Sequence, residues 1–329
     1  TPTEHEWIFL VGEEGLLAPG PRLKTMALPE VKRSWFRRLL FDGLTGRRLI
    51  QPLTPDVVFS LQNTVAYGLS VPQVVYVHQP LPFQDVVNFR LLRRDERRLA
   101  AYQHLIGRVI KWSIKHADRT IVQTHWMREA IIHQVGVEPG RIERVAPDLE
   151  DLSAYRDTIV PDRRQFFFPT GPLSYKNQGC IEEANRILRA KGLTEFRVRV
   201  TSDTPSSDPN IDSIGQLPRE DALRVLSSCT LVFPSLIESY GLPLAEARSL
   251  GTLVLAADCS YAREVLAGYE NAYFFDPQVP RELARLMDTV IHGKIERFES
   301  VASFSPSPET GWGRVVGILE EVATASMGA

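Results

Sequence analysis

The sequence has few cysteines, and they stand apart from one another. Its 329 residues include only Cys180, Cys229 and Cys259, and no two of them form a C-x-x-C pair. This spacing argues against a disulfide framework and against a zinc knuckle. Isolated cysteines of this kind are typical of reduced thiols in a cytosolic protein.

Long apolar runs and a strong net charge are missing as well. No run approaches the roughly 18 apolar residues that cross a bilayer, and no signal peptide is visible ahead of the apolar residues 7–11. The formal net charge is −2, so no global basicity indicates a nucleic-acid partner. We therefore expect a cytoplasmic protein, with peripheral contact at the inner face of the membrane left open.

Glycine-rich nucleotide loops of the usual kinds do not occur either: the sequence has no G-x-G-x-x-G and no Walker P-loop.

With 43% apolar residues, the chain can fill two hydrophobic cores. Both halves read as alternating strands and helices, which predicts an α/β protein with two doubly wound domains and a cleft between them. The acidic, proline-bounded residues 147–161 predict the interdomain connection, which divides the chain into 1–150 and 151–310.

The most informative stretch is residues 232–251, which read VFPSLIESYGLPLAEARSLG. Its apolar start predicts the end of a buried strand, and the Pro-Ser pair ends that strand. Gly241, Leu242 and Pro243 open a helix, because proline is favoured in the first turn, where its missing N–H would have no partner. Gly251 closes the helix in the position where glycine is common.

Two carboxylates flank the start of this helix, Glu238 in the loop and Glu246 about one turn inside. The amides of Gly241, Leu242 and Leu244 stand at the positive end of the helix dipole, which suits a phosphate. Carboxylates are instead good acceptors for pairs of sugar hydroxyls. A sugar nucleotide would satisfy both requirements. For two glutamates at this spacing taken alone, a capped helix with solvated side chains is the better interpretation.

The complete block resembles the E-x7-E region of retaining glycosyltransferases of the GT-B fold, family 4. That region reads close to PSxxEGFGLPxLEAMAxGxPV, and this chain has PSLIESYGLPLAEARSLGTLV followed by a matching ADCSYAREVLAGYENAYFFDP. The resemblance implies that Glu238 contacts hydroxyls of the transferred sugar and that Glu246 holds the ribose hydroxyls. It also implies that Gly241 and Leu242 offer amides to the distal phosphate of the donor. Further donor-binding candidates are Pro243, Ser239, Tyr240 and Gly171.

A second loop, PTGPLSYKNQG, follows the predicted strand at 166–168 and contains Gly171 and Lys176. Lys176 matches the family lysine that binds the donor diphosphate, and a cation there would balance the two glutamates. The arginine that family members often carry after the loop glycine is Pro172 here. We therefore expect phosphate binding to use a residue from elsewhere in the chain, and a surface lysine in a polar loop is the alternative.

His78 follows the predicted strand at 74–77. Ligands of open parallel sheets bind beyond the carboxyl ends of the strands, so the position suits a site residue. Position alone leaves an ordinary loop histidine equally open. The resemblance implies a catalytic role for His78 near the transferred sugar, together with Glu238 and Lys176.

Residues 83–116 are the most basic part of the chain and show the apolar periodicity of a helix. One interpretation is a solvated helix face on which Asp95 and Glu96 partly balance the arginines. The other is contact with an anionic membrane, or with the phosphates of a lipid-linked acceptor. The residues that would make this contact are Arg93, Arg94, Arg97 and Arg98.

The two ends of the chain carry further expectations. The strand at 7–11 looks like the second strand of the family's acceptor-binding domain, so its first β-α unit is missing from the sequence. Either the protein is short here or further residues precede Thr1. The resemblance also implies that the helix predicted at 311–325, within residues 311–329, packs back on the first domain. Elsewhere, Thr124 is predicted as the N-cap of a helix at 125–134.

The resemblance implies a retaining glycosyltransferase of the hexosyltransferase type, which moves a sugar from a nucleotide-sugar donor to a glycan or lipid-linked acceptor in cell-surface polysaccharide synthesis. No D-x-D pair, the metal site of the other common glycosyltransferase fold, occurs. We therefore expect no metal and no cofactor, the nucleotide-sugar being a substrate. The alternatives are an inactive GT-B protein that binds sugar nucleotides or scaffolds an assembly, and another GT-B enzyme such as a sugar-nucleotide epimerase.

Overall fold

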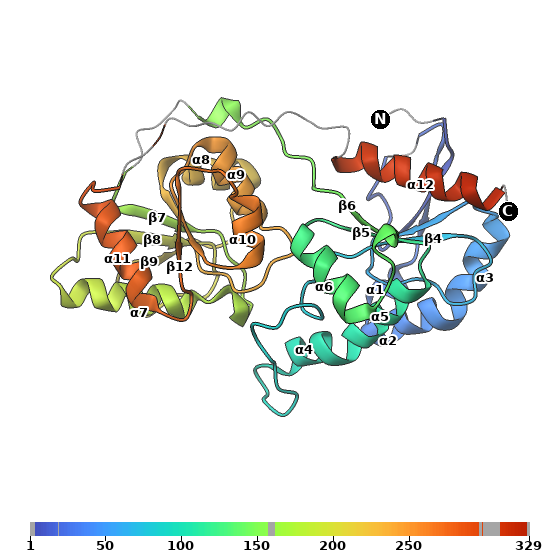
Figure 1. Ribbon diagram of the computed structural model, residues 1–329, viewed down its shortest axis with the longest axis horizontal. Helices are drawn as coiled ribbons and strands as arrows, with labels where there is room; N and C mark the ends of the chain where they lie inside the picture. The colour runs from blue at the N-terminus through green and yellow to red at the C-terminus, as the bar shows by residue number, and fades with distance from the viewer. Residues whose placement is uncertain (1–3, 19, 157–161, 296–297, 299–309, 328–329) are drawn as a thin grey trace.

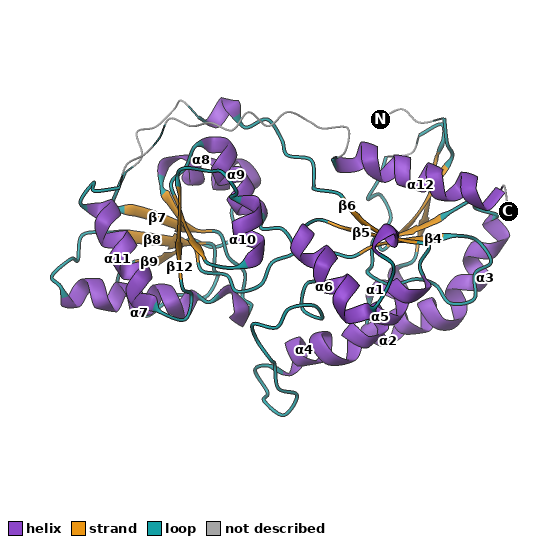
Figure 2. Cartoon of the chain, viewed as in Figure 1, coloured by secondary structure: helices purple, strands orange, loops and turns teal. Residues whose placement is uncertain are grey.

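The computed structural model describes residues 4–18, 20–156, 162–295, 298 and 310–327. In this part the chain forms two α/β domains that lie side by side (Figure 1). All strand pairs in the named sheets are parallel. In each domain the strands lie between helices (Figure 2), as parallel sheets require both faces to be covered.

The second domain contains a six-stranded sheet with the order β12-β11-β10-β7-β8-β9. The order reverses between β7 and β10, so the sheet is doubly wound, and a ligand is expected beyond the carboxyl ends of these two neighbours. The strands are β7 (Gln165–Phe168), β8 (Arg197–Val200), β9 (Ile211–Ser213), β10 (Thr230–Phe233), β11 (Val254–Ala257) and β12 (Ala272–Phe275).

The two central strands, β7 and β10, are apolar after their first residue, because both faces of the sheet are covered. Phe166, Phe168 and Phe233 are at most 1% exposed. Figure 1 draws α7 below the strands and α8 with α9 above them. The helices and short turns are η5 (Ser153–Tyr155), η6 (Ser174–Lys176), α7 (Gln178–Ala190), α8 (Arg219–Ser228), α9 (Leu242–Leu250), α10 (Ser260–Val265) and α11 (Pro280–Ile291).

The first domain contains a four-stranded sheet with the order β3-β4-β5-β6. Its strands are shorter than the apolar runs suggested, and β3 is only half-buried. The strands are β3 (Val58–Ser60), β4 (Gln73–Tyr76), β5 (Arg119–Val122) and β6 (Ile142–Arg144). The helices and turns from α4 onward are α4 (Arg97–Ala100), the π-helical η3 (Ala101–Ile106), α5 (Gly107–His116), α6 (His125–Val135) and η4 (Pro139–Arg141).

The N-terminal region differs from the sequence prediction in one respect. The predicted strand β1 (Trp7–Val11) is present, and it pairs with β2 (Leu23–Ala27), a strand that the sequence analysis did not predict. These two form a separate sheet, and no ladder joins them to β3 within the described residues. The polar, partly exposed β2 has little of the apolar pattern that marks a strand. The helical turns that follow are α1 (Pro29–Lys32), α2 (Trp35–Leu40), the π-helical η1 (Phe41–Thr45), α3 (Gly46–Ile50) and η2 (Gln51–Leu53).

The helix predicted across residues 83–116 begins only at Arg97, so the prediction is wrong for residues 83–96. In this segment the backbone groups hydrogen-bond to glutamine side chains and do not form the i→i−4 hydrogen bonds of a helix. The amide of Phe89 donates to Gln103 Oε1 at 2.9 Å, and Gln103 Nε2 donates to the carbonyl of Val87 at 2.7 Å. Phe89 is 4% exposed and packs in a cluster with Leu81, Ala100 and Ile237.

The C-terminal helix α12 (Gly311–Met327) returns to the first domain, where Figure 1 shows it above the strands. Its apolar side chains pack against the faces of β4 and β5, which supply Val74 and Ile121. The amide of Trp312 donates to Asp148 Oδ2 at 3.0 Å, which fixes the start of the helix. The packed residues of the helix are Val315, Ile318, Leu319 and Val322.

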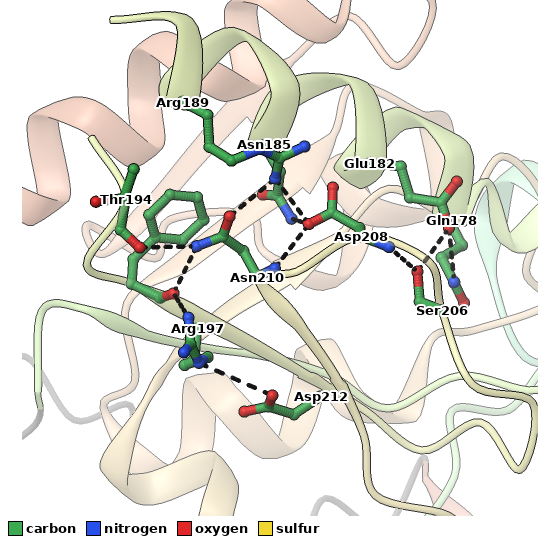
Figure 3. Close-up of polar contacts among 11 residues, drawn as sticks. Gln178, Glu182, Asn185, Arg189, Thr194, Arg197, Ser206, Asp208, Asn210 and Asp212 are labelled. Atoms are coloured by element: carbon green, nitrogen blue, oxygen red, sulfur yellow. Dashed lines mark hydrogen bonds and ion pairs between the residues drawn. The ribbon is translucent and has the colours of Figure 1, made fainter. Parts of the chain in front are cut away.

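A network of polar side chains ties α7 to the loop that precedes β9 (Figure 3). Arg189 Nη1 donates to Asp208 Oδ1 and to Asn210 Oδ1, both at 2.8 Å. Asn210 Nδ2 donates in turn to the carbonyls of Thr194 and Phe196. The Asp208 side chain is 6% exposed, and burial of a carboxylate requires a partner of this kind.

Candidate functional site

The loops after β7 and β10 meet at the reversal of the strand order, as the topology requires. The amide of Leu236 donates to the carbonyl of Tyr175 at 2.9 Å. Asn177, whose backbone is left-handed with φ 59°, donates from Nδ2 to the carbonyls of Pro234 and Pro277. Asn177 was not among the predicted site residues, although the sequence places it next to Lys176.

The helix α9 begins as predicted, with Gly241 before it and Pro243 in its first turn. Gly241 has φ 90°, and an added Cβ would lie 3.3 Å from Leu244 and Tyr261 atoms, so both conformation and space favour glycine. The amide of Leu244, which was predicted to point outward, instead donates to the carbonyl of Gly241 at 2.9 Å. The first amides of a helix have no acceptor within it, and anion binding by the amide of Leu242 stays a prediction.

Lys176 and Glu238 form an ion pair at this point. Lys176 Nζ lies 2.5 Å from Glu238 Oε1, and the two side chains are 19% and 16% exposed. Burial raises the pKa of the neighbouring Tyr175 to about 12, and the Glu238 carboxylate adds to the shift. The structure therefore brings together two of the three residues predicted to be catalytic.

Glu246 is bound by an arginine that the sequence analysis did not identify. Arg219 Nη1, from the first turn of α8, donates to Glu246 Oε1 at 2.6 Å, and Arg219 Nη2 donates to Glu150 Oε2 at 3.1 Å. Hydrogen bonding to Glu246 raises the pKa of Arg219 above its ordinary value. The pair lies at a pocket of about 190 Å³, lined by Asp148, Leu149, Glu150, Leu152, Arg219, Leu242, Glu246 and Ser249.

Two buried tyrosines support the loop between β10 and α9. Tyr261 is 2% exposed, and its hydroxyl donates to the carbonyl of Ser235 at 2.5 Å. Burial raises the pKa of Tyr261 well above its ordinary value, so it remains a neutral donor. Tyr240 is 8% exposed and belongs to the core of the second domain. Tyr240, predicted as a donor-binding residue, therefore packs inward, and its position in the core indicates support of the loop.

His78 lies after β4 in the first domain, as predicted. Its amide donates to Asn63 Oδ1 at 2.8 Å, and its Nε2 lies 3.5 Å from Asn63 Nδ2. Asn63 has a left-handed backbone with φ 64°, a conformation that asparagine tolerates better than most residues. Partial burial lowers the pKa of His78 below its ordinary value, which favours the neutral imidazole. No contact between His78 and Lys176 or Glu238 is present among the described residues.

The two domains are joined beside the donor loop. Thr124 is the N-cap of α6 as predicted, but its hydroxyl donates to the carbonyl of Ser239 at 2.9 Å and does not cap its own helix. Glu264 of α10 takes over that role: its carboxylate accepts from the amides of His125 and Trp126 at 2.7 and 3.1 Å. Glu264 lies near the C-terminal end of α10, which spans Ser260–Val265.

The predicted arginine cluster lies in an exposed turn and in the first turn of α4. Arg93 Nη1 lies 2.9 Å from Glu96 Oε1, and Arg97 Nε is 3.4 Å from the carbonyl of Leu91. The buried side of the same segment contacts the second domain, since Leu81, Phe89 and Ala100 form a cluster with Ile237. Arg94 and Arg98 are exposed.

Gly171 lies in open surroundings, where an added Cβ would meet no atom within 4 Å.

Among the residues that the structure describes, no group of three or more His, Cys, Asp or Glu side chains could hold a metal ion. The described helices include none with the length and apolarity needed to cross a bilayer. Metal independence stays a prediction.

Comparisons with known proteins match both domains. Residues 9–147 match the model of Glycosyltransferase Family 4, and residues 206–304 match that of Glycosyl transferases group 1. Both models describe glycosyltransferases, and together they support a group 1 glycosyltransferase of the GT-B fold. The resemblance of the E-x7-E region is thereby confirmed at the level of the family and its fold.

The chain is similar to the serotype-specific mannosyltransferase WbdA of Escherichia coli. One match is 27% identical over 214 residues, which are 63% of this chain and 23% of that protein. Another is 30% identical over 138 residues, 41% of this chain and 15% of the relative. The chain thus spans less than a quarter of the length of the curated relatives that it matches.

Solved structures at 14% identity share the fold. Anabaena Alr3699/HepE in complex with UDP and glucose aligns with a TM-score of 0.62 over 93% of this chain and 86% of that one. WaaG, a glycosyltransferase involved in lipopolysaccharide biosynthesis, aligns with 0.58 over 84% and 81%. TarM aligns with 0.56 over 74% of this chain and 50% of that one.

Proposed function

We propose that this glycosyltransferase moves a hexosyl group from a nucleotide-sugar donor to a glycan or lipid-linked acceptor, with retention of the anomeric configuration. The observation that carries the proposal is the position of Lys176, Glu238 and Glu246 around the N-terminus of α9. WbdA and WaaG, named for mannosyl transfer and lipopolysaccharide biosynthesis, support a role in cell-surface polysaccharide synthesis.

In this mechanism the ion pair between Lys176 and Glu238 is exchanged when the donor binds. A diphosphate oxygen at the start of α9 competes for the lysine, since an ammonium binds phosphate through charge-assisted hydrogen bonds. Glu238 then becomes free to accept hydrogen bonds from hydroxyls of the transferred sugar. The 2.5 Å pair therefore holds each group near its working position before the donor arrives.

The ribose of the donor is placed in the pocket beside Glu246. The carboxylate can accept from two neighbouring hydroxyls, and its hydrogen bond with Arg219 orients it. Leu242 and Leu152 line the same pocket and offer apolar contact to the nucleoside. Arg219 thus supplies a cation close to the donor that the sequence analysis expected from elsewhere in the chain.

Catalysis at this site is electrostatic stabilisation of the leaving diphosphate. Lys176 and the α9 N-terminus oppose the negative charge that grows on the departing phosphate as the glycosidic bond breaks. That phosphate accepts the proton of the attacking acceptor hydroxyl on the same face of the sugar, which retains the configuration. His78, held by Asn63 and favoured in its neutral form, is placed to hydrogen-bond the sugar from the first domain.

The test begins with thermal unfolding in the presence of a panel of nucleotide sugars that vary in base and in sugar. A donor that binds only the folded protein raises the Tm, by an amount that grows with the logarithm of the donor concentration above its Kd. Transfer from the stabilising donor to glycan and lipid-linked acceptors is then followed with labelled sugar, and NMR of the product reports the anomer. Inversion would refute retention. Stabilisation without any transfer would favour a binding protein.

A further inference from the structure

The loop after β3 reaches the backbone and the ring of His78 through one carboxamide, that of Asn63. The backbone of Asn63 is left-handed, with φ 64°. Asparagine adopts this conformation more readily than most residues, yet it persists only where the surrounding structure holds it. The contacts on both sides of Asn63 show what holds it and what the side chain does in return.

The residue that follows Asn63 is fixed in the interior of the first domain. Thr64 is buried, and its hydroxyl donates to Asp42 Oδ2 at 2.7 Å. Arg38 Nε donates to the same carboxylate oxygen at 3.0 Å. Burial raises the pKa of Asp42, and the charge of Arg38 opposes that shift. The backbone at Thr64 therefore has little freedom, and the carboxamide of Asn63 is held towards β4.

The orientation of this carboxamide follows from its partners. Asn63 Oδ1 accepts from the amide of His78 at 2.8 Å and from that of Gln79 at 3.0 Å. A backbone N–H can only donate, so the atom that faces both amides must be the carboxamide oxygen. The pairing of β4 with β5 ends at Val77, whose amide donates to the carbonyl of Ile121. Asn63 thus binds the next two amides of the chain, where the sheet no longer does.

The other end of the carboxamide faces the imidazole ring. Once the oxygen is assigned, this end is an NH₂ group, which can only donate. Asn63 Nδ2 lies 3.5 Å from His78 Nε2. A hydrogen bond between these two atoms requires an acceptor on the ring, so Nε2 carries no proton. In a neutral imidazole one nitrogen is protonated and the other is not, which places the proton on Nδ1.

The same contact disfavours the charged ring. An imidazolium carries protons on both nitrogens, and its Nε2–H would face the N–H groups of Asn63. Burial, which lowers the pKa of His78, acts in the same direction. The titratable neighbour of the ring is Tyr76, whose ring centroid lies 6.3 Å away, and burial raises the pKa of Tyr76, so it stays uncharged. In the described part of the chain, no charged side chain forms a hydrogen bond with the ring of His78.

We propose that Asn63 is a positioning residue that selects the tautomer of His78 with the proton on Nδ1. Nδ1 has no hydrogen-bond partner among the residues that the structure describes. His78 also follows the carboxyl end of β4, where ligands of a parallel sheet bind. The ring therefore offers a ligand a donor and no acceptor.

This tautomer sets the direction of hydrogen bonding to a sugar. A hydroxyl group can donate or accept, and facing Nδ1–H it must accept. Its own proton is then left for another acceptor, such as the carboxylate of Glu238. Only this consequence rests on the proposed function, because the tautomer itself is measured without a donor.

The test is a long-range ¹H–¹⁵N correlation spectrum of the full chain, labelled with ¹⁵N in its histidines. It is recorded about two pH units above the usual histidine pKa of about 6.5, so that the rings are neutral. The Hδ2 proton couples to Nε2 and the Hε1 proton to both nitrogens, so the spectrum reports which nitrogen is protonated. The signals of His78 are those that disappear in His78→Gln.

Two other histidines provide references of opposite kind in the same spectrum. His104 Nε2 lies 3.0 Å from the carbonyl of Phe89, and a carbonyl only accepts, so the proton of His104 is on Nε2. His116 Nδ1 lies 2.8 Å from the carbonyl of Trp112, so the proton of His116 is on Nδ1. We expect the pattern of His78 to match that of His116.

Asn63→Asp keeps the shape of the side chain and reverses its chemistry at the ring. One carboxylate oxygen still accepts from the two amides, whereas the other faces Nε2 as an acceptor, so the proton of His78 should move to Nε2. The signals of His104 and His116 should not change, which verifies the fold. At the same pH this variant should lower kcat/KM for the donor about twofold to tenfold, as expected for the loss of one neutral hydrogen bond.

The matched control is Asn88→Asp, which adds the same charge at an exposed position of the same domain. It should change neither the tautomer of His78 nor kcat/KM.

A proton on Nε2 of His78 in the unmodified protein would overturn the proposal, and this result needs no variant. An unchanged tautomer in Asn63→Asp would overturn it as well, and a lower kcat/KM with that result would assign Asn63 a structural role alone. A switched tautomer with unchanged transfer would support the role of Asn63 and contradict the contact between His78 and the sugar. The tautomer and the proposed function can therefore fail separately.

Discussion

Replacement of Glu246 tests the donor site most directly. In the free protein the Glu246 carboxylate is bound by Arg219 at 2.6 Å and is 14% exposed. Arg219 is 55% exposed and also contacts Glu150. The arginine therefore keeps a partner and its hydration when Glu246 is removed. An ion pair with one exposed partner contributes at most about 1 kcal/mol, so we expect Glu246→Ala to fold with little loss of stability.

Its effect on donor binding should be larger. A carboxylate that accepts from two ribose hydroxyls makes charge-assisted hydrogen bonds of about 1.5–3 kcal/mol, which corresponds to roughly tenfold to 150-fold. The ribose does not change during transfer, so the contact is equally strong in ground state and transition state. Glu246→Ala should therefore raise the donor KM by that factor and leave kcat nearly unchanged.

Steady-state kinetics with varied donor is the assay, and Glu220→Ala is the matched control, since Glu220 also lies on the surface of this region but contacts Arg224. Glu246→Gln should fall between the unmodified protein and the alanine variant, because the amide keeps one acceptor oxygen. A fall in kcat with an unchanged donor KM would refute the assignment of Glu246 to the ribose. The same pattern in Glu220→Ala would indicate a general structural effect.

Three further predictions follow from the contacts described above. Arg189→Leu leaves the buried carboxylate of Asp208 without its cation and should lower the free energy of unfolding by roughly 3 kcal/mol. Arg186→Leu removes one partner of an exposed ion pair and should lower it by less than about 1 kcal/mol. Urea unfolding of the two variants measures the difference. Glu264→Gln should loosen the contact between the domains, which lowers kcat while the unfolding midpoint changes little. A fall in kcat accompanied by a matching loss of stability would contradict this. Burial lowers the pKa of His78 in the folded protein, so the unfolded chain binds this proton more readily and the free energy of unfolding falls as pH falls below about 6.5. His78→Gln should reduce that fall in stability. An unchanged pH dependence of stability in this variant would exclude His78 as its source.

Much of the α9 region could be read from the sequence, because the signals there are local. Gly241, Pro243 and Gly251 act on the backbone within a single helix, through left-handed conformations and a missing N–H. The apolar runs of β7 and β10, the two strands at which the strand order reverses, likewise predicted that both strands are buried. Hence the doubly wound second domain and the start and end of α9 were predictable without coordinates.

The helix predicted at residues 83–96 failed because periodicity records only which residues are apolar. Phe89 contributes to that periodicity, yet it is buried in a turn whose backbone binds Gln103. Side-chain capture of a backbone is not visible in an apolar pattern. The strand β2 was missed because its polar residues lack the apolar pattern that marks a strand. Its strand conformation depends on hydrogen bonds to its partner β1.

The sequence by itself determined the family, the helix that presents its N-terminus to the donor, and the identity of Lys176, Glu238 and Glu246. Only the tertiary structure decided which charges meet. Lys176 pairs with a residue 62 positions away, Arg219 with one 27 positions away, and Glu264 with amides 138 and 139 positions away. Such pairs depend on the packing of whole domains, because no local preference of the backbone or of the side chains brings residues this distant within hydrogen-bonding reach.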